Sequence, residues 1–486
     1  MKNLNRQATN NTKKRPLKVL QFGGGNFLRA FVDLMVHVLN QETDFNAGVV
    51  VVKPTERGDY QMLKSQDGLF TVILDGIKKG MPIADMTLVD CVQEIVNPYS
   101  EWDAYLELAK NPDIRFVVSN TTEAGIKFDP ADTFEDMPPK EFPAKLTIWL
   151  YQRFQHFGND VSKGCILLPC ELIEDNGEAL KAAIMQYAAH WNLDGNFVNW
   201  IYTANYFCST LVDRIVSGYP AERVVKIQST LGYEDKLLVA GEYYHSWVIK
   251  GPELVAKELP FDQTDLNVAF VDDLTPYREM KVRILNGAHT SMVPVGYLAG
   301  LRLVKDVMDD DVVSGFVESL LRRESITTLN FPESVLNKFV EDVLDRFRNP
   351  LLKHQLISIS LNSTSKFVAR LLPSLTDYYI ATGSLPQRIV FGLSALIRFY
   401  KGEFGGERIE LKDDAKILYF FASNWEKYDN KELKMNILVG IILSNTSIWG
   451  KDLTKFEGMV ETISQNILSI ETNGVLATIK NLPNDN

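Results

Sequence analysis

Hydrophobic residues follow different patterns in the two parts of this chain. In the first part they form short continuous runs rich in β-branched residues, at residues 17–22, 48–53, 114–119 and 164–169. Such runs are typical of buried strands in a parallel sheet. After residue 280 these runs no longer appear, and apolar residues recur at helical spacing. The clearest helical stretches are residues 312–321, 335–347 and 388–400.

Helices are also predicted between the strands of the first part, at residues 100–110, 145–157 and 179–191. An alternation of strands and helices is typical of an α/β domain with a parallel sheet. We therefore predict an α/β Rossmann-type N-terminal domain over residues 16–280 and a mainly α-helical C-terminal domain over residues 281–486. Residues 1–15 are polar, and we predict a flexible tail for them.

Composition and charge exclude several classes of function. The formal net charge of −11 argues against a general nucleic-acid binder, because phosphate contacts need clustered Lys and Arg. The four cysteines form no C-x-x-C pair, and the six histidines show no metal-ligand spacing. No apolar run reaches about 18 residues and no signal-peptide core is present, so we expect a cytoplasmic protein without a membrane span. The oligomeric state stays open.

A glycine turn follows the first predicted strand. Gly23 suits a tight turn, and Gly25 lets the backbone approach a pyrophosphate, because neither residue has a Cβ. The next helix would direct free N–H groups toward the phosphates. Leu28 stands where the usual pattern has a third glycine, so a plain glycine turn of another α/β protein stays an alternative. If the turn binds a dinucleotide, the expected contacts are Gln21, Phe22, Gly23, Gly24, Gly25, Asn26, Phe27, Leu28 and Arg29.

Two further strand ends bear on the cofactor. Lys53 and Glu56 follow the second strand, where a carboxylate favours NAD and a basic residue favours NADP, so these residues leave the choice open. Small polar residues follow the strand at 114–119, a position at which parallel sheets bind ligands. A capped turn, with Thr122 starting the next helix, is compatible with this interpretation. The expected contacts are Asn120, Thr121, Thr122 and Glu123.

The start of the helical part contains a lysine, an asparagine and a histidine at the spacing K-x4-N-x2-H. On an α-helix, Lys281, Asn286 and His289 fan across an arc of about 140°, so all three reach toward one cleft. They supply a proton carrier and two hydrogen-bonding groups, which suits proton transfer to and from a hydroxyl. The alternative is an ordinary amphipathic helix with a polar side in water. The position just after the α/β domain favours a place in the wall of a cofactor cleft.

Three motifs, G-x-G-N-F-x-R-A, V-D-R-I and K-x4-N-G-x-H, make the chain resemble the mannitol dehydrogenase family of polyol and aldonate dehydrogenases. The resemblance implies a metal-independent, NAD-dependent enzyme that interconverts the keto-uronate D-tagaturonate and the aldonate D-altronate. It also implies that Lys281 is the acid/base, while Asn286 and His289 hold the reacting oxygen and orient the sugar.

The resemblance further implies substrate contacts at Ser209, Asp213, Arg214 and Lys366. Ser209 stands where polyol enzymes of the family usually have asparagine, and Ser358 stands where some have arginine. Both departures argue against simple mannitol or fructose chemistry. The substrate carboxylate needs a basic partner, and Lys366, Arg214 and Arg370 are candidates that the sequence does not rank.

Alternatives remain for the residues and for the function. Asp213 and Arg214 could form a structural ion pair, and Lys366 could be a solvated helix residue. The protein could act on fructuronate or on a related polyol. It could also be a Rossmann protein that senses a dinucleotide without catalysis, although the set of Lys281, Asn286 and His289 argues against this.

Overall fold

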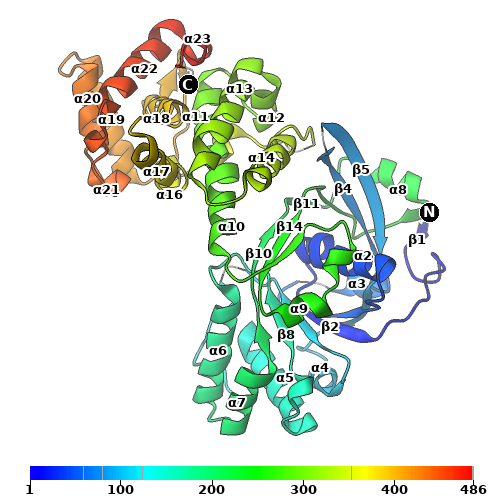
Figure 1. The fold of residues 1–486 in the computed structure, drawn as a ribbon. Coiled ribbons are helices and arrows are strands. Elements are labelled where there is room, and N and C mark those ends of the chain that lie inside the picture. The colour runs from blue at the N-terminus through cyan, green and yellow to red at the C-terminus, as the bar shows by residue number, and fades with distance from the viewer. Residues whose placement is uncertain (59, 79, 123, 352, 484–486) are drawn as a thin grey trace. The chain divides into compact units, whose positions relative to one another are not determined.

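The computed structural model describes residues 1–486 except residues 59, 79, 123, 352 and 484–486. The chain divides into two compact units (Figure 1). Unit 1 comprises Met1–Asp75 and Pro82–Leu274, and unit 2 comprises Gly76–Met81 and Thr275–Asn486. The second unit begins before the predicted boundary at residue 281, because helix α10 (Thr275–Met280) runs directly into Lys281. The predicted fold class, α/β followed by helical, is confirmed.

A six-stranded sheet forms the centre of unit 1, and its described strand pairs are all parallel. The strands, in spatial order, are β6 (Val92–Val96), β3 (Gly48–Val52), β2 (Leu17–Phe22), β7 (Phe116–Ser119), β8 (Ile166–Pro169) and β9 (Tyr206–Phe207). Four of these match the apolar runs of the sequence. Their carboxyl ends meet at one edge of the sheet, where ligands bind in such folds.

Alternate residues of each strand point to opposite faces, so each face has a core of its own. Val19 and Val49 pack on one face beside the helical segment after the glycine turn. Leu20 and Val50 pack on the other face against α5 and its neighbours (Figure 1). The helices of unit 1 are α1 (Asn26–Leu28), α2 (Leu34–Glu42), α3 (Gln61–Ser65), α4 (Trp102–Glu107), α5 (Phe142–Phe157), α6 (Asn176–His190), α7 (Gly195–Ala204), α8 (Val224–Leu231) and α9 (Glu253–Glu258).

Two smaller sheets complete unit 1. One contains β10 (Ser209–Asp213), β14 (Ser246–Lys250) and β15 (Val268–Val271). The other contains β11 (Val216–Gly218), β13 (Val239–Glu242), β4 (Phe70–Lys78) and β5 (Met81–Val89). The helical segment that follows the glycine turn contacts β11 and β13 of the second of these sheets.

The prediction of a flexible tail at residues 1–15 is wrong. The short strand β1 (Lys2–Asn3) pairs in parallel with β12 (Tyr233–Glu234), and Leu4 is fully buried. The guanidinium of Arg6 donates to the carbonyl oxygens of Asp90 and Val92 at 3.0 and 2.7 Å. Three anchors spread over a polar segment therefore hold it, and none of them produces a periodic hydrophobic pattern.

Unit 2 is built of helices around α18 (Gln387–Phe399), in which every residue from Arg388 onward is buried. Helices α11 (Gly287–Leu298) and α22 (Met459–Asn473) pack against it. The surrounding helices are α12 (Val304–Asp309), α13 (Asp311–Ser319), α14 (Glu333–Phe347), α15 (Leu356–Ile359), α16 (Ser363–Arg370), α17 (Leu372–Thr382), α19 (Ala415–Asp429), α20 (Met435–Leu443), α21 (Thr446–Trp449) and α23 (Val475–Lys480).

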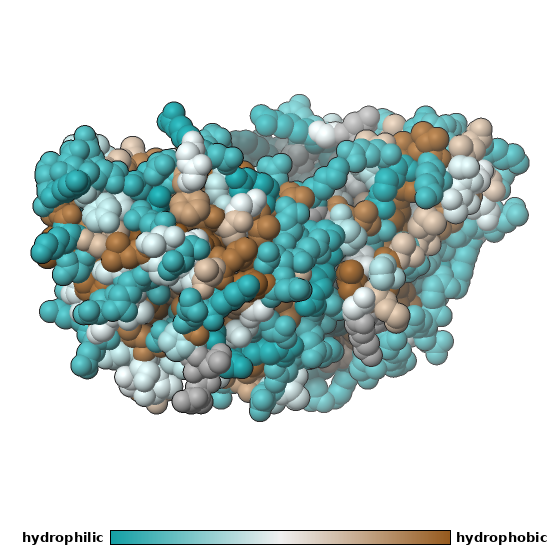
Figure 2. All heavy atoms as spheres, turned by 90° about the horizontal axis from the view of Figure 1, so that it is seen from above, coloured by the Kyte–Doolittle hydropathy of each residue, from teal (hydrophilic) through white to brown (hydrophobic). Residues whose placement is uncertain are grey.

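Hydrophilic side chains cover most of the surface seen in Figure 2, with hydrophobic ones between them. The exposed hydrophobic residues include Ile380 and Tyr419 on helices of unit 2. No helix among the described residues has the length and hydropathy required to cross a bilayer.

Candidate functional site

The glycine turn of unit 1 is fixed by its backbone. Gly23 has a φ of +117°, which side-chain-bearing residues rarely adopt, and its amide donates to the carbonyl of Val52 at 3.0 Å. A Cβ on Gly23 would lie 3.2 Å from Leu28 Cδ1 and 3.3 Å from the carbonyl oxygen of Asn120. Gly23 is therefore needed for the turn itself, as predicted.

Gly24 and Gly25 differ in what surrounds them. The amide of Gly24 donates to the Tyr60 hydroxyl at 2.9 Å, and a Cβ there would lie 2.8 Å from the Tyr60 ring. Gly25 is exposed, has an ordinary φ of −72°, and would place a Cβ with no atom within 4 Å. Space for a ligand at the backbone therefore exists at Gly25.

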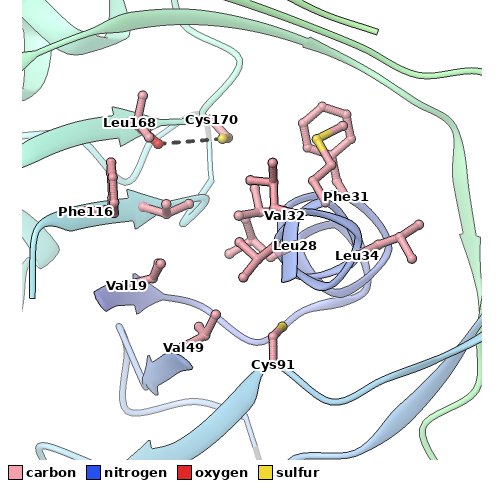
Figure 3. Close-up of a cluster of buried hydrophobic side chains, with 14 of the residues drawn as sticks. Val19, Leu28, Phe31, Val32, Leu34, Val49, Cys91, Phe116, Leu168 and Cys170 are labelled. Atoms are coloured by element: carbon pink, nitrogen blue, oxygen red, sulfur yellow. Dashed lines mark hydrogen bonds between the residues drawn. The ribbon is translucent and has the colours of Figure 1, made fainter. Parts of the chain in front are cut away.

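The helix after the turn is continuous from Asn26 to Glu42, with a π-helical segment at Arg29–Asp33. Leu28, which replaces the third glycine of the usual pattern, is 1% exposed and belongs to the hydrophobic core. Figure 3 shows Leu28 on the side of this helix that faces the strand residues Val19 and Val49. Packing by a leucine side chain thus takes the place of a close glycine contact.

The polar residues around the turn bind other parts of unit 1. The amide of Gln21 donates to the Gly23 carbonyl at 3.0 Å and to Asp33 Oδ2 at 3.3 Å. The guanidinium of Arg29 donates to Asn26 Oδ1 at 2.7 Å and to the carbonyl of Leu237, and burial lowers the pKa of Arg29. Both side chains therefore brace the turn.

Two of the aromatic residues predicted to contact the cofactor are placed differently. The side chain of Phe22 is fully buried, with its ring 4.7 Å from that of Phe142, so only its backbone lies at the turn. Phe27 is partly exposed and stacks on Phe31 at 4.9 Å. Of these two side chains, only that of Phe27 can contribute contact surface to a ligand.

The end of β7 is organised by Glu171, which the sequence analysis did not single out. Its carboxylate accepts hydrogen bonds from Ser119 Oγ at 3.0 Å and from the amide and hydroxyl of Thr121 at 2.9 and 3.0 Å. Asn120 donates from Nδ2 to the Cys170 carbonyl at 2.8 Å. Burial raises the pKa of Glu171. The position directly after a neighbouring parallel strand was the only signal for this residue.

Thr122 is exposed, and no helix starts there, because the next α-helix begins at Phe142. The idea that Thr122 caps a helix is therefore wrong. Glu123 lies outside the described residues. Lys53 is 9% exposed, with Nζ 5.9 Å from the centre of the Tyr99 ring, whereas Glu56 is exposed.

In unit 2, the motif stretch departs from the regular α-helix assumed from the sequence. Lys281–Asn286 is π-helical, and the α-helix α11 starts at Gly287. The arc calculated for an α-helix therefore does not apply between Lys281 and Asn286. Short π-helical segments frequently occur at functional sites. Lys281, Asn286 and His289 are each partly exposed.

His289 lies in a basic environment. Its ring centre is 4.5 Å from that of Phe347 and 5.2 Å from that of His354. Burial lowers the pKa of His289 well below its ordinary value, and the positive charges of His354, Arg346, Arg370 and Lys366 lower it further. The imidazole is therefore neutral at neutral pH.

The three candidates for the substrate carboxylate fall into different places. Arg214 is buried in unit 1 and donates to the carbonyls of Ala30, Tyr244 and Tyr243 at 2.5, 3.2 and 3.3 Å. Burial lowers the pKa of Arg214 to about 10. Lys366 and Arg370, in contrast, are partly exposed, and their positive charges lower the pKa of His289.

Of the remaining residues at substrate positions, Ser209 and Asp213 belong to unit 1 and Ser358 belongs to unit 2. Ser209 is buried at the start of β10 and lines a cavity of about 260 Å³, together with residues such as Lys250 and Asp272. Asp213 ends the same strand and is partly exposed. Ser358, in unit 2, is exposed.

Two family models match the chain in succession. Residues 17–263 match the mannitol dehydrogenase Rossmann domain, and residues 273–471 match the mannitol dehydrogenase C-terminal domain. The chain belongs to the mannitol dehydrogenase family. As a mannitol dehydrogenase family member, it is an oxidoreductase that acts on a CH–OH group.

Curated members of the mannitol dehydrogenase family resemble the chain over nearly its full length. An altronate oxidoreductase of Yersinia enterocolitica is 46% identical over 468 residues, which is 96% of this chain and 97% of the relative. An altronate oxidoreductase of Escherichia coli O6:K15:H31 is 45% identical over 483 residues, which is 99% of this chain and 100% of the relative.

Two solved structures share the fold of the chain. A substrate-free D-sorbitol dehydrogenase has a TM-score of 0.76 at 21% identity, with 95% of both chains covered. The Pseudomonas fluorescens mannitol 2-dehydrogenase, in ternary complex with NAD and D-mannitol, has a TM-score of 0.63 at 21% identity, with 99% of both chains covered.

Proposed function

We propose that this protein interconverts D-tagaturonate and D-altronate with NAD as the hydride carrier. The observation that carries the proposal is the near full-length similarity to relatives named altronate oxidoreductase, at 45% and 46% identity. The basic side chains around His289 support it, because both sugars are acids and a carboxylate pairs well with Arg and Lys.

The glycine turn suits a dinucleotide. The open space at Gly25 leaves backbone accessible to a phosphate, and the continuous helix from Asn26 directs its first N–H groups to the same place. We assign NAD binding to this turn and to the segment that begins at Asn120. When bound, the cofactor would supply a hydride as NADH in reduction and would take one up as NAD⁺ in oxidation.

Lys281 handles the proton in this proposal. As an ammonium it donates a proton to the substrate oxygen during reduction, and as a neutral amine it removes the proton during oxidation. The side-chain amide of Asn286 donates a hydrogen bond to the same oxygen as negative charge builds on it, a contribution of roughly 3 kcal/mol. A metal ion is unnecessary, because the lysine stabilises the alkoxide.

His289 orients the sugar and does not carry the proton. Its pKa lies well below the ordinary value because of burial and the neighbouring basic groups, so it is neutral under working conditions. A neutral imidazole has one donor and one acceptor nitrogen, which suits a hydrogen bond to a sugar hydroxyl. Ser209, Asp213 and Lys366 are assigned to the remaining substrate contacts.

The proposal is tested by steady-state kinetics of the purified full-length protein with D-tagaturonate and D-fructuronate, each with NADH and with NADPH. We expect the highest kcat/KM with tagaturonate and NADH. Faster turnover of fructuronate would show that the protein acts on the other keto-uronate. NADH binding without turnover of any keto-acid would instead show a dinucleotide sensor.

A further inference from the structure

Basic side chains from three parts of unit 2 surround His289. Arg346 lies near the end of α14, His354 lies in the segment before α15, and Lys366 and Arg370 lie on α16. Helix α16 packs against both the π-helical segment and α11, and α14 packs against the π-helical segment. Packing therefore brings these charges together beside the proposed reaction centre.

Acidic groups face two of these cations but not Arg370. Asp342 is close enough to Arg346 for the two charges to influence each other. Burial and the charge of Arg370 lower the pKa of Lys366, and the charge of Asp413 partly offsets this. Lys366 also donates to the carbonyl of Ile359 at 2.8 Å. Among the described residues, no carboxylate contributes to the pKa of Arg370, which burial lowers.

The position of Arg370 is set by the same helix that carries the proposed catalytic residues. Its Nη1 donates to Thr290 Oγ1 at 3.2 Å, and Thr290 Oγ1 in turn donates to the carbonyl of Asn286 at 2.9 Å. Thr290 directly follows His289. One hydroxyl therefore links the guanidinium to the turn of helix that contains Asn286. A guanidinium has five N–H donors in all, so this bond uses one of them.

We propose that Arg370 binds the carboxylate of the acid sugar and thereby selects keto-uronates and aldonates over neutral ketoses and polyols. This inference rests on the proposed function. A guanidinium offers two parallel N–H donors to a carboxylate, which gives direction as well as charge. Lys366 and Arg346 add positive charge around the same place, and Arg214 takes no part because its donors already bind backbone carbonyls.

The test compares Arg370→Gln with the wild-type enzyme on D-tagaturonate and on the neutral ketose D-fructose. Loss of a charge-assisted pair predicts that the KM for tagaturonate rises about 10- to 100-fold, with a smaller change in kcat. Activity on fructose should stay equal or increase. Arg370→Lys should restore part of the affinity, because it keeps the charge but not the planar fork.

A matched control is Arg302→Gln. Arg302 is also in unit 2, but it forms an exposed ion pair with Glu407 at 2.9 Å and lies over the Tyr297 ring. Arg302→Gln should leave the KM and the kcat for both substrates unchanged. NADH binding by fluorescence and the midpoint of thermal unfolding show whether each variant is folded.

A measurement on the wild-type protein avoids variants altogether. A carboxylate subsite predicts that D-gluconate inhibits competitively with tagaturonate, whereas D-sorbitol, its neutral counterpart, inhibits at least tenfold less. Equal inhibition by D-gluconate and D-sorbitol, or an unchanged KM in folded Arg370→Gln, overturns the assignment of Arg370. Neither result bears on the proposed function. A wild-type enzyme that reduces no keto-uronate overturns the proposed function itself.

Discussion

The glycine turn of unit 1 and the motif stretch of unit 2 both include a π-helical segment, yet they present different chemistry. Around the turn, Gln21, Asn120 and Arg214 all donate to backbone carbonyls, and Gly25 is left with an open backbone. Around His289, the basic side chains of Lys366 and Arg370 are partly exposed and that of Arg346 is buried. One region offers backbone and shape, whereas the other offers charge.

Under the proposed function, this difference separates two ways of recognising a ligand. All dinucleotide cofactors contain the same pyrophosphate, so its recognition requires no selection. Fixed backbone amides at the start of a helix are sufficient to bind it. A carboxylate distinguishes one sugar from another, and charged side chains discriminate against molecules that lack it, because the charges are then left unpaired. Substitutions that reverse either property test the comparison.

The largest effect is expected at Lys281, the residue to which we assign the proton transfer. Lys281→Ala should lower kcat about 10³-fold, in the range observed for general acid–base catalysis, while NADH binding in unit 1 is unchanged. Stopped-flow or steady-state kinetics measure the first quantity, and fluorescence titration measures the second. Added methylamine should restore part of the rate.

Lys305→Ala is the matched control, because Lys305 forms a surface ion pair with Asp309 in the same unit. It should retain normal kinetics. A near-normal kcat for Lys281→Ala would mean that another group handles the proton.

The next effect concerns stability. Arg214→Ala removes a buried guanidinium and its hydrogen bonds to the carbonyls of Ala30, Tyr243 and Tyr244. We expect a loss of about 3 kcal/mol, which lowers the unfolding midpoint of a unit of this size by about 6 °C. Calorimetry measures this loss. The control is Arg322→Ala, which removes a partly exposed ion pair with Glu318 and a hydrogen bond to Asn337.

Folded Arg214→Ala should keep the KM for the keto-uronate within about twofold, because its donors serve the backbone. A large rise in KM without a change in the unfolding midpoint would contradict the division between the two regions and would return Arg214 to the substrate site.

The glycine turn could be predicted from the sequence because its residues are contiguous and form a recognisable local pattern. Gly23, Gly25 and the apolar strand before them are contiguous, and Leu28 marks where the usual pattern is broken. The spacing of Lys281, Asn286 and His289 was equally visible. Its π-helical geometry was not, because hydrophobic periodicity carries no information on a local change of hydrogen-bond register.

Residues brought in by tertiary packing were missed. Glu171 follows β8 but organises the end of β7, and Arg346 and His354 reach His289 from elements far from it in sequence. The anchors Leu4 and Arg6 in the N-terminal segment were likewise invisible, since each acts alone in a polar stretch. The sequence could therefore name the centres of both regions but not the residues that surround them.

A third prediction concerns the buried acid beside the glycine turn. Asp33 has no exposed surface, and burial raises its pKa to about 7, although Gln21 donates to it and the charge of Arg29 lowers the pKa. In the unfolded chain an aspartate titrates near 3.9. Between these two values the native state holds a proton that the unfolded state has released, so stability falls as the pH rises from about 4 to about 7.

Asp33→Asn cannot ionise and should remove this dependence. Relative to the wild type, the variant should gain about 2 kcal/mol between pH 5 and pH 8, as measured by chemical unfolding at each pH. Asp160→Asn should show no such gain, because hydrogen bonds from Ser162 lower the pKa of Asp160. A pH-independent difference between Asp33→Asn and the wild type would mean that Asp33 is charged, and the turn would then present charge as well as backbone.

The smallest effect is expected at Gly25, and it tests the backbone side of the comparison directly. Its φ of −72° suits any residue and a Cβ meets no protein atom, so Gly25→Ala should fold with an unchanged unfolding midpoint. If a phosphate approaches this backbone, the added methyl group should weaken NADH binding about tenfold, or about 1.4 kcal/mol. Gly315→Ala, also in open space but in unit 2, should leave NADH binding unchanged. Unaltered binding in Gly25→Ala would place the pyrophosphate elsewhere, and the open backbone at Gly25 would then be only the start of a helix.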